Sequence, residues 1–353
     1  MKLQRRVVVT GLGLISPLGN SVLSSWKSCA NGESGISLVD NKIKNSPVSI
    51  GGKINNLNIE SYIEKKDIRR LDTFIQYGVV AAKQAIDDSG LIDNHINLDR
   101  IGINFGTGIG GIETIENNHK SYLDKGYRKV SPFFVPGSIA NMTSGFISIK
   151  YGLRGPNLCT VTACSSGSHS VGQAARSIAY GEADAMVTGG SEMASTELSI
   201  SGFISARALS LSTNPKTASR PWDIDRDGFV LSDGAGALIL EELDHATNRG
   251  ANIYAEVIGF GMSSDAYHMT APPDNGSGAA LSMKNAINDA ELNPNDIDYI
   301  NAHGTSTPLG DIAEAKAIMS VFSDKKPAIS STKSMTGHTL GAAGAIELSL
   351  IHI

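Results

Sequence analysis

Short apolar, β-branched runs alternate with longer Ala-rich segments along most of this chain. Apolar residues at helical spacing predict a helix over 74–89, whereas the apolar runs at 6–10 and 101–105 predict buried strands. The alternation continues with a predicted helix over 165–180 and with predicted strands over 185–188, 235–241 and 299–302. Strands that alternate with helices are typical of βαβ units, so the pattern predicts an α/β fold around a mainly parallel sheet.

One helix, together with the strand after it, occurs twice in the sequence. The segment AIDDSGL at 85–91 resembles AINDAEL at 286–292, and each is followed by a strand that contains Ile-Asn, at Ile103 and Ile300. Helix sequences of this kind are common, so chance similarity is the alternative. We interpret the pair as an internal repeat, because a recurring helix and strand at matched positions indicate a duplicated structural unit.

The repeat extends to two turns that end in Cys164 and His338, each of which leads into a helix rich in small residues. Duplication would place these residues at equivalent helix N-termini, close to one local two-fold axis. We therefore predict two related halves, residues 1–250 and 251–353. No Pro-rich or charged linker divides them, so we expect them to pack as one compact unit.

Composition excludes several classes of function. The chain has 353 residues, is 41% hydrophobic and carries a formal charge of −5, which supports a large core and gives no general attraction for nucleic acid. Gly11 and Gly13 interrupt the apolar run near the basic N-terminus, so we predict a buried strand rather than a signal peptide. No run approaches the ~20 apolar residues of a membrane span. Cys29, Cys159 and Cys164 lack metal spacing and cannot all pair, which favours a reducing compartment, the cytoplasm.

Cys164 and two histidines carry the candidate chemistry. Cys164 lies in TACSSG, where a following helix would stabilise a thiolate and the Cys164 N–H could donate to the oxyanion of a thioester. His303 ends a predicted strand, the position that lines ligand crevices in α/β sheets, and His338 lies in a small-residue turn. Both imidazoles could donate to the enolate oxygen that forms as carbon dioxide leaves a malonyl group. A metal site is the alternative, but no short ligand pair supports it, so we predict none.

Four further motifs accompany these residues: RRVVVTGLG at 5–13, RPWD at 220–223, DGF at 227–229 and LGAAG at 340–344. With them, the chain resembles the β-ketoacyl-acyl-carrier-protein synthases of the thiolase-like condensing enzymes, most closely the elongating type II members. The resemblance covers nearly the whole chain. It implies a thiolase-like α/β fold, with duplicated βαβ halves in αβαβα layers. It also implies decarboxylative condensation of acyl-ACP with malonyl-ACP (ACP, acyl carrier protein) to β-ketoacyl-ACP, carbon dioxide and ACP in fatty-acid elongation.

The resemblance also implies roles for individual residues. Cys164 would accept the acyl chain, while His303 and His338 would assist malonyl decarboxylation. Lys333 would order the site and tune a histidine, a role that is compatible with a salt bridge to Glu347. These side chains come from distant parts of the sequence. The resemblance therefore requires the fold to bring them together.

Substrate contacts follow from the same resemblance. Thr305 and Thr307 would hold the phosphopantetheine arm, unless they only cap a turn. Ile109 would line the acyl pocket, and Phe203 would stand beside the entrance unless it is a buried core residue. The arm arrives on the carrier protein, so no cofactor of the chain's own is implied. Ser16 replaces the third glycine of a dinucleotide fingerprint, which also argues against such a cofactor.

The expected partner is an acidic carrier protein, which requires a local basic patch despite the net negative charge. The residues that match the carrier-facing positions are Lys65, Lys66, Arg69 and Arg70, at helical spacing, with Arg128, Lys129 and Arg207. As a bare feature, such a charge run is more often a solvated face. The family resemblance also implies a homodimer, and no nucleic-acid or membrane partner is expected.

The last residues depart from the family pattern. The closing Gly-Phe-Gly-Gly-Thr-Asn segment is absent from the sequence, which stops inside the helix that follows His338. We therefore expect the second half to be incomplete and to lack its final strands. Two alternatives remain open, a polyketide-type ketosynthase that uses the same three residues and an inactive truncated remnant.

Overall fold

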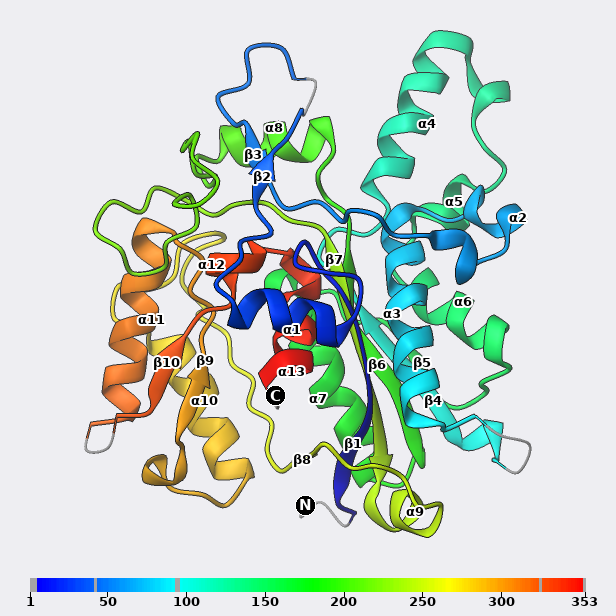
Figure 1. Ribbon diagram of the computed structural model, residues 1–353, viewed down its shortest axis with the longest axis vertical. Coiled ribbons are helices and arrows are strands. Elements are labelled where there is room, and N and C mark those ends of the chain that lie inside the picture. Colours follow the sequence, from blue (N-terminus) through cyan, green and yellow to red (C-terminus); the bar gives the residue numbers. More distant parts are fainter. Residues whose placement is uncertain (1–4, 41–42, 93–95, 324–325, 352–353) are drawn as a thin grey trace.

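The computed structural model describes residues 5–40, 43–92, 96–323 and 326–351, and its centre is a six-stranded sheet (Figure 1). The strand order is β5-β4-β6-β7-β1-β8. The strands of this sheet are β1 (Val7–Ile15), β4 (Ile101–Gly106), β5 (Asn157–Leu158), β6 (Ala185–Glu192), β7 (Gly234–Glu242) and β8 (Ala255–Val257). Only β4 pairs in parallel, with β5 and β6, whereas β7 and β1 pair antiparallel with their neighbours. The predicted α/β fold is confirmed, but the sheet is mixed rather than mainly parallel.

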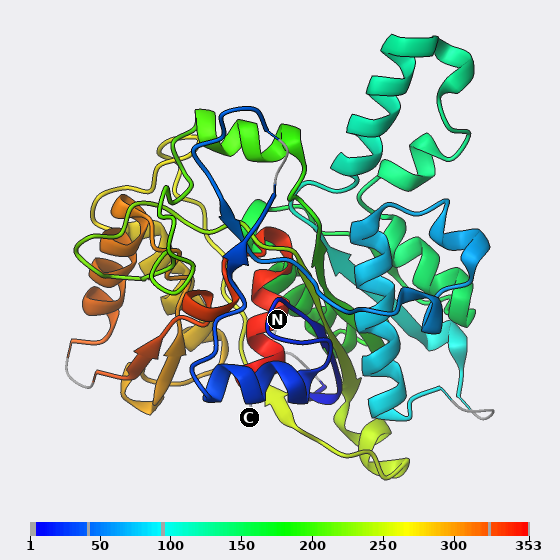
Figure 2. The same ribbon diagram turned by 45° about the horizontal axis from the view of Figure 1, so that its top comes forward.

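Helices cover both faces of this sheet. The long helix α3 (Thr73–Ser89) packs on one face with α6 (Met142–Tyr151), while α7 (Ser166–Ala179) and α13 (Ala343–Ile351) pack on the other (Figures 1 and 2). Beyond them, α10 (Ser277–Asp289) and α11 (Pro308–Val321) pack on each other beside a small parallel sheet of β9 (Tyr299–Asn301) and β10 (Ala328–Ser330). The order of the elements is thus helix, sheet, helix, sheet, helix.

The remaining elements are short or peripheral. They are α1 (Val22–Ala30), β2 (Ser37–Leu38), β3 (Ile50–Gly51), α2 (Lys65–Ile68), α4 (Ile112–Lys125), α5 (Phe134–Ser138), α8 (Glu197–Ser205), α9 (Leu243–Asn248) and α12 (Lys333–Thr336). Helix α4 projects away from the body of the molecule in both ribbon views. Within the described ranges, no helix is both long and apolar enough to traverse a lipid bilayer.

The first strand is longer than predicted because its glycines serve close packing. Strand β1 continues past residue 10 to Ile15, with a register shift between Val9 and Gly11. A Cβ atom added at Gly11 would lie 2.3 Å from the Ala85 carbonyl oxygen, and one at Gly13 would lie 2.0 Å from the Ala81 oxygen. These glycines therefore let α3 pack directly on the strand instead of ending it.

The predicted repeat is confirmed as a structural duplication. In the first half, α3 leads through the 3-10 turn Leu98–Arg100 to β4, and in the second half α10 leads through the 3-10 turn Pro294–Asp296 to β9. Helices α4 and α11 then follow, and the next strands, β5 and β10, pair in parallel with β4 and β9. Among the described residues of the second half, β9 and β10 form a two-stranded sheet of their own, whereas β8 joins the edge of the six-stranded sheet.

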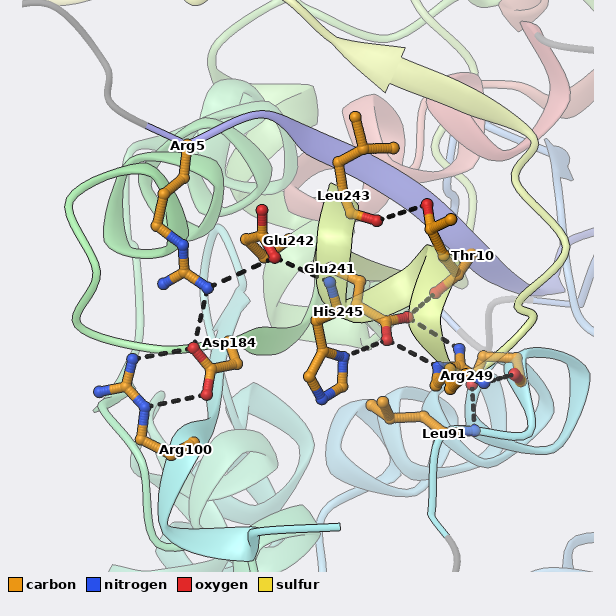
Figure 3. A network of polar contacts seen from close by, with 12 residues as sticks. Arg5, Thr10, Leu91, Arg100, Asp184, Glu241, Glu242, Leu243, His245 and Arg249 are labelled. Atoms are coloured by element: carbon orange, nitrogen blue, oxygen red, sulfur yellow. Dashed lines mark hydrogen bonds and ion pairs between the residues drawn. The ribbon is translucent and has the colours of Figure 1, made fainter.

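A polar network fastens one end of the sheet (Figure 3). Asp184 accepts hydrogen bonds from the guanidinium groups of Arg5 and Arg100 at 2.8 and 2.9 Å. The fully buried Glu241 accepts from Arg249 and from Thr10, at 2.6 and 2.9 Å. These groups lie where β6 begins and β7 ends. They are therefore distant along both strands from the glycine-rich turns at the other end of the sheet.

Candidate active site

The structure brings Cys164, His303 and His338 together. Cys164 lies in the 3-10 turn Ala163–Ser165 that precedes α7, and His338 lies between α12 and the 3-10 turn Leu340–Ala342 that precedes α13. Ligand atoms of all three side chains lie within 4.8 Å of one another. The Nε2 atom of His338 is 3.0 Å from the Cys164 sulfur. The duplicated turns thus meet, as the repeat requires.

Small residues allow this approach. A Cβ atom at Gly167 would lie 2.9 Å from the Ala345 nitrogen, and one at Gly344 would lie 2.0 Å from the Ser168 hydroxyl oxygen. Helices α7 and α13 therefore pack almost backbone to backbone at their N-terminal ends. This close packing places the two preceding turns side by side.

Both turns contain a non-glycine residue in the left-handed region. Ala163, directly before Cys164, has φ +51°, and Leu340, two residues after His338, has φ +47°. Such conformations cost about 1–3 kcal/mol and persist only where surrounding contacts hold them. At Ala163 the holding group is the Ser166 hydroxyl, which donates to the Ala163 carbonyl at 2.7 Å and accepts from the Thr162 N–H at 2.9 Å.

The surroundings of Cys164 raise the thiol pKa, which corrects the prediction that a helix N-terminus would stabilise the anion. Burial is the larger cause, and the positive charge of Lys333 opposes it. Helix α7 begins at Ser166, after its N-cap Ser165, so Cys164 precedes the helix proper. The proton of Cys164 therefore needs an acceptor, and His338 Nε2 is at hydrogen-bond distance.

Both histidines are held neutral. Burial, then the nearby His303 and Lys333, lowers the pKa of His338 well below its ordinary value. Desolvation by the surrounding protein atoms, and then the charge of Lys333, also lower the pKa of His303. His303 is nevertheless exposed to solvent, and water beside it limits the shift of its pKa. Neutral imidazoles can each accept one proton and donate another.

Lys333 is a buried residue close to the site, and it pairs with Glu347. The Lys333 ammonium and the Glu347 carboxylate form an ion pair, with side chains only 2% and 16% exposed. Burial raises the pKa of Glu347, while Lys333 opposes that shift. The salt bridge considered from sequence is therefore present, and the positive charge of Lys333 also acts on Cys164 and both histidines.

Two acidic residues that the sequence reasoning missed hold the His303 turn. Glu314 accepts from the N–H groups of His303 and Gly304, both at 2.7 Å, and Asp311 accepts from the Ser306 N–H at 3.1 Å. Both acids lie on the buried side of α11. Their spacing, three residues apart just after His-Gly-Thr-Ser-Thr, was the available sequence signal.

The predicted substrate-contact residues differ in their relation to this centre, and none of them is among the residues that line the groove described below. Thr307 occupies the N-cap of α11 but makes no capping bond with its side chain, and its hydroxyl lies 3.0 Å from that of Thr305. Phe203 packs edge-on against Phe229 at 5.3 Å, and Phe229 packs against His338 at 5.2 Å. Phe203 is thus half-buried in the cluster that also contacts Cys164.

Ile109 lies in the loop after β4 and is 39% exposed. A Cβ atom on the preceding Gly108 would lie 3.5 Å from the carbonyl oxygen of Ala163. The loop therefore touches the turn that carries Cys164. Its backbone N–H groups donate to Glu192, a third carboxylate that the sequence reasoning missed.

The basic residues are exposed, but their predicted helical face is only partly right. Helix α2 covers Lys65–Ile68, so Arg69 is its C-cap and Arg70 lies outside it. Ion pairs neutralise three of these charges. Glu60 pairs with Lys65, Glu64 pairs with Lys66 and Asp67 pairs with Arg70. In the described part of the chain, no carboxylate lies within ion-pair distance of Arg69, Arg128, Lys129 or Arg207.

A groove of about 950 Å³ adjoins Cys164 and the exposed His303. Its walls include Cys164, His303, Glu347, Phe260 and Met262. The Cys-His-His cluster offers three of the four ligands that zinc normally takes in proteins. The absence of a metal therefore stays a prediction.

Comparison with known proteins identifies the relatives of this site. The model of the β-ketoacyl synthase N-terminal domain matches residues 4–246, and that of the C-terminal domain matches residues 254–352. The 3-oxoacyl-[acyl-carrier-protein] synthase 2 of Vibrio cholerae is 56% identical over 98% of this chain and 84% of its own length, and that of Staphylococcus aureus (strain COL) is 49% identical over the same shares.

Solved structures agree with these relatives. A β-ketoacyl synthase from Burkholderia phymatum superposes with a TM-score of 0.91 at 33% identity, over 99% of this chain and 85% of its own. A type II PKS acyl-carrier protein in complex with its ketosynthase also matches, with a TM-score of 0.91 at 33% identity, over 99% of this chain and 86% of that one. Family models, relatives and fold lead to one conclusion: the chain belongs to the β-ketoacyl synthase family.

Proposed function

We propose that this chain catalyses the decarboxylative condensation of acyl-ACP with malonyl-ACP, as an acyltransferase of fatty-acid elongation. The observation that supports it most directly is the 3.0 Å contact between His338 Nε2 and the Cys164 sulfur, with His303 beside them. The higher identity to 3-oxoacyl-ACP synthase 2 proteins than to the polyketide ketosynthase favours fatty-acid over polyketide elongation.

The first half-reaction is acyl transfer. His338 Nε2 accepts the thiol proton, and the Cys164 sulfur attacks the thioester carbonyl of acyl-ACP. The carbon–sulfur bond to Cys164 forms as the bond to the carrier thiol breaks, and the carrier thiolate takes the proton that His338 Nε2 had accepted. The Cys164 N–H is the proposed donor to the oxyanion. The acyl chain then extends toward Ile109.

The second half-reaction is condensation. Once Cys164 is acylated, the Nε2 of His338 is no longer needed as an acceptor, and His338 takes the neutral tautomer that carries its proton on Nε2. The malonyl thioester loses carbon dioxide, and the Nε2–H groups of His303 and His338 donate to the developing enolate oxygen. The carbanion attacks the Cys164 thioester, a carbon–carbon bond forms as the carbon–sulfur bond to Cys164 breaks, and the released thiolate takes up one proton from solvent. Neutral histidines suit this step because each retains one N–H donor. Lys333 acts electrostatically, because its positive charge lies close to Cys164, His303 and His338.

The acyl carrier protein is the proposed partner, and its phosphopantetheine arm supplies the only prosthetic group of the reaction. The paired hydroxyls of Thr305 and Thr307 are the proposed contacts for that arm. Arg69, Arg128, Lys129 and Arg207 are the strongest docking candidates because no carboxylate among the described residues pairs with them. A homodimer in the cytoplasm is the proposed context.

Intact mass spectrometry after incubation with acyl-ACP tests the proposal. We expect an acyl adduct on the wild-type chain, no adduct on Cys164→Ala, and a carbon dioxide-releasing condensation when malonyl-ACP is added. Acylation that persists in Cys164→Ala would refute the nucleophile assignment. A chain that is acylated but never condenses with malonyl-ACP would support the proposed acyl transfer and contradict the proposed elongation.

Charge reversal tests the docking surface. Arg69→Glu should raise the KM for acyl-ACP at low salt and leave the rate with an acyl-pantetheine substrate unchanged, because only the carrier is acidic. Lys83→Glu, on α3, is the matched control. An unchanged KM for acyl-ACP in Arg69→Glu would contradict the assignment.

A further inference from the structure

Glu192, at the end of β6, is a buried carboxylate that the mechanism above does not use. Its side chain is completely buried, and four donors from two separate segments surround it. One oxygen, Oε1, accepts from the Thr107 hydroxyl at 2.9 Å and from the Ile109 N–H at 3.2 Å. The other, Oε2, accepts from the N–H groups of Gly108 at 2.6 Å and Gly341 at 3.0 Å.

These two segments flank the reacting groups. The first segment, residues 107–109, ends at Ile109. In the second segment, Gly341 directly follows Leu340, the residue with left-handed backbone two positions after His338. The segments approach so closely that a Cβ atom on Gly341 would lie 2.2 Å from the Gly108 nitrogen. A single carboxylate therefore links the loop beside the Cys164 turn to the strained turn that follows His338.

A buried charge with this many donors is a rigid connection. Removing a carboxylate from water costs free energy, and hydrogen bonds to several N–H groups offset that cost only if the donors keep their positions. Moving Ile109 would lengthen the bond from its own N–H, and it would also disturb the neighbouring Gly108 bond. The position of Ile109 is thus coupled to Glu192.

We propose that Glu192 is a positioning residue that sets acyl-chain selectivity by fixing the Ile109 loop, which lies beside the Cys164 turn, to the turn that follows His338. This inference rests on the proposed function, since it concerns the acyl chain carried by Cys164. Glu192 touches neither Cys164 nor a histidine through a hydrogen bond, so it acts through the backbone that it binds. Wild-type Ile109 then presents a fixed wall, which discriminates between chains of different length.

The substitution Glu192→Gln separates this role from a general loss of structure. The amide keeps one acceptor oxygen and gains an NH₂ donor. The Thr107 hydroxyl can turn to accept from that donor, whereas the backbone N–H of Ile109 cannot, so the orientation with NH₂ toward Oε1 frees Ile109. The bonds to Gly108 and Gly341 are kept in this orientation. The acyl-chain selectivity should therefore change, whereas the geometry of the catalytic centre should change little.

The matched control is Glu241→Gln. Glu241 is equally buried and also bound by several donors, but it lies at the other end of the sheet, in the network of Figure 3. Both variants lose charge in the interior and should lose thermal stability. Only Glu192→Gln should alter the choice of acyl chain.

The experiment measures Cys164 acylation rates with octanoyl-ACP and palmitoyl-ACP by intact mass spectrometry, in the wild type and both variants. Glu192 also raises the pKa of Cys164, so its removal changes both rates together, and their ratio cancels that effect. We expect the ratio to move about tenfold toward unity in Glu192→Gln, within the range by which apolar pockets discriminate, and to stay unchanged in Glu241→Gln.

Thr107→Val, which removes the hydroxyl donor to Oε1, should move the ratio in the same direction by less. It decides the question alone if Glu192→Gln does not fold. An unchanged ratio, or an equal change in Glu241→Gln, would overturn the inference. A wild-type chain that is not acylated by either substrate would overturn the proposed function and this inference with it, so the two failures are distinguishable.

Discussion

The buried ion pair of Lys333 and Glu347 permits a quantitative prediction. Their side chains are 2% and 16% exposed, so the pair belongs to the buried class rather than to the exposed class worth about 0–1 kcal/mol. The change Lys333→Met leaves the carboxylate without its cation. We expect the free energy of unfolding to fall by about 3–5 kcal/mol near neutral pH.

The sign of the pH dependence follows from Glu347. Burial raises its pKa and Lys333 opposes that effect, so Lys333→Met raises the pKa of Glu347 further. A folded-state pKa above the unfolded value means that stability is present at low pH and is lost as pH rises through the folded pKa. The deficit of Lys333→Met should therefore be largest at high pH and shrink as Glu347 becomes protonated.

Urea unfolding at a series of pH values measures this deficit. The double variant Lys333→Met with Glu347→Leu should recover most of the loss, because an apolar pair replaces the buried charges. The exposed pair Lys83–Asp87, with side chains 32% and 59% exposed, provides the control Lys83→Met. A loss no larger than that of Lys83→Met, or one independent of pH, would refute the reasoning.

Three further outcomes are expected. Two arginines lower the pKa of Asp184 to about 2, so Asp184→Asn should cost about 2 kcal/mol near pH 7, and the wild-type advantage should vanish as pH falls from about 4 through about 2, as measured by acid denaturation. Gly13→Ala should destabilise by about 1–3 kcal/mol in thermal unfolding, because its Cβ would lie 2.0 Å from a carbonyl oxygen of α3; no change would contradict the packing argument. His338→Ala should slow iodoacetamide alkylation of Cys164 near pH 7 by about 10²-fold, because the acceptor for the thiol proton is lost; an unaltered rate would show that another group takes the proton.

The order of the elements was predictable because it depends on local periodicity. The apolar spacing over 74–89 predicted a helix that begins at Thr73 and ends at Ser89, and the strands at β4, β6 and β7 were predicted within a few residues of their ends. The duplicated sequence also predicted that the turns of Cys164 and His338 would meet. Neither inference required knowledge of which surfaces pack together.

Other features were not predictable from local sequence. Gly11 and Gly13 were interpreted as the end of a strand, although they lie within it, because the helix that packs on them is distant in sequence. The predicted lowering of the Cys164 pKa was wrong because it considered the helix end and not the burial around the sulfur. Both errors concern contacts with segments far along the chain.

The sequence by itself determined the alternation of strands and helices, the repeat, and the residue types that condensation needs. Only the tertiary structure decided that one strand end would deliver Glu192 to two distant backbone loops, and that Glu314 would hold the turn of His303. The physical reason is that residue type and spacing act locally, whereas burial, electrostatic environment and close backbone approach arise only when separate segments share one interior.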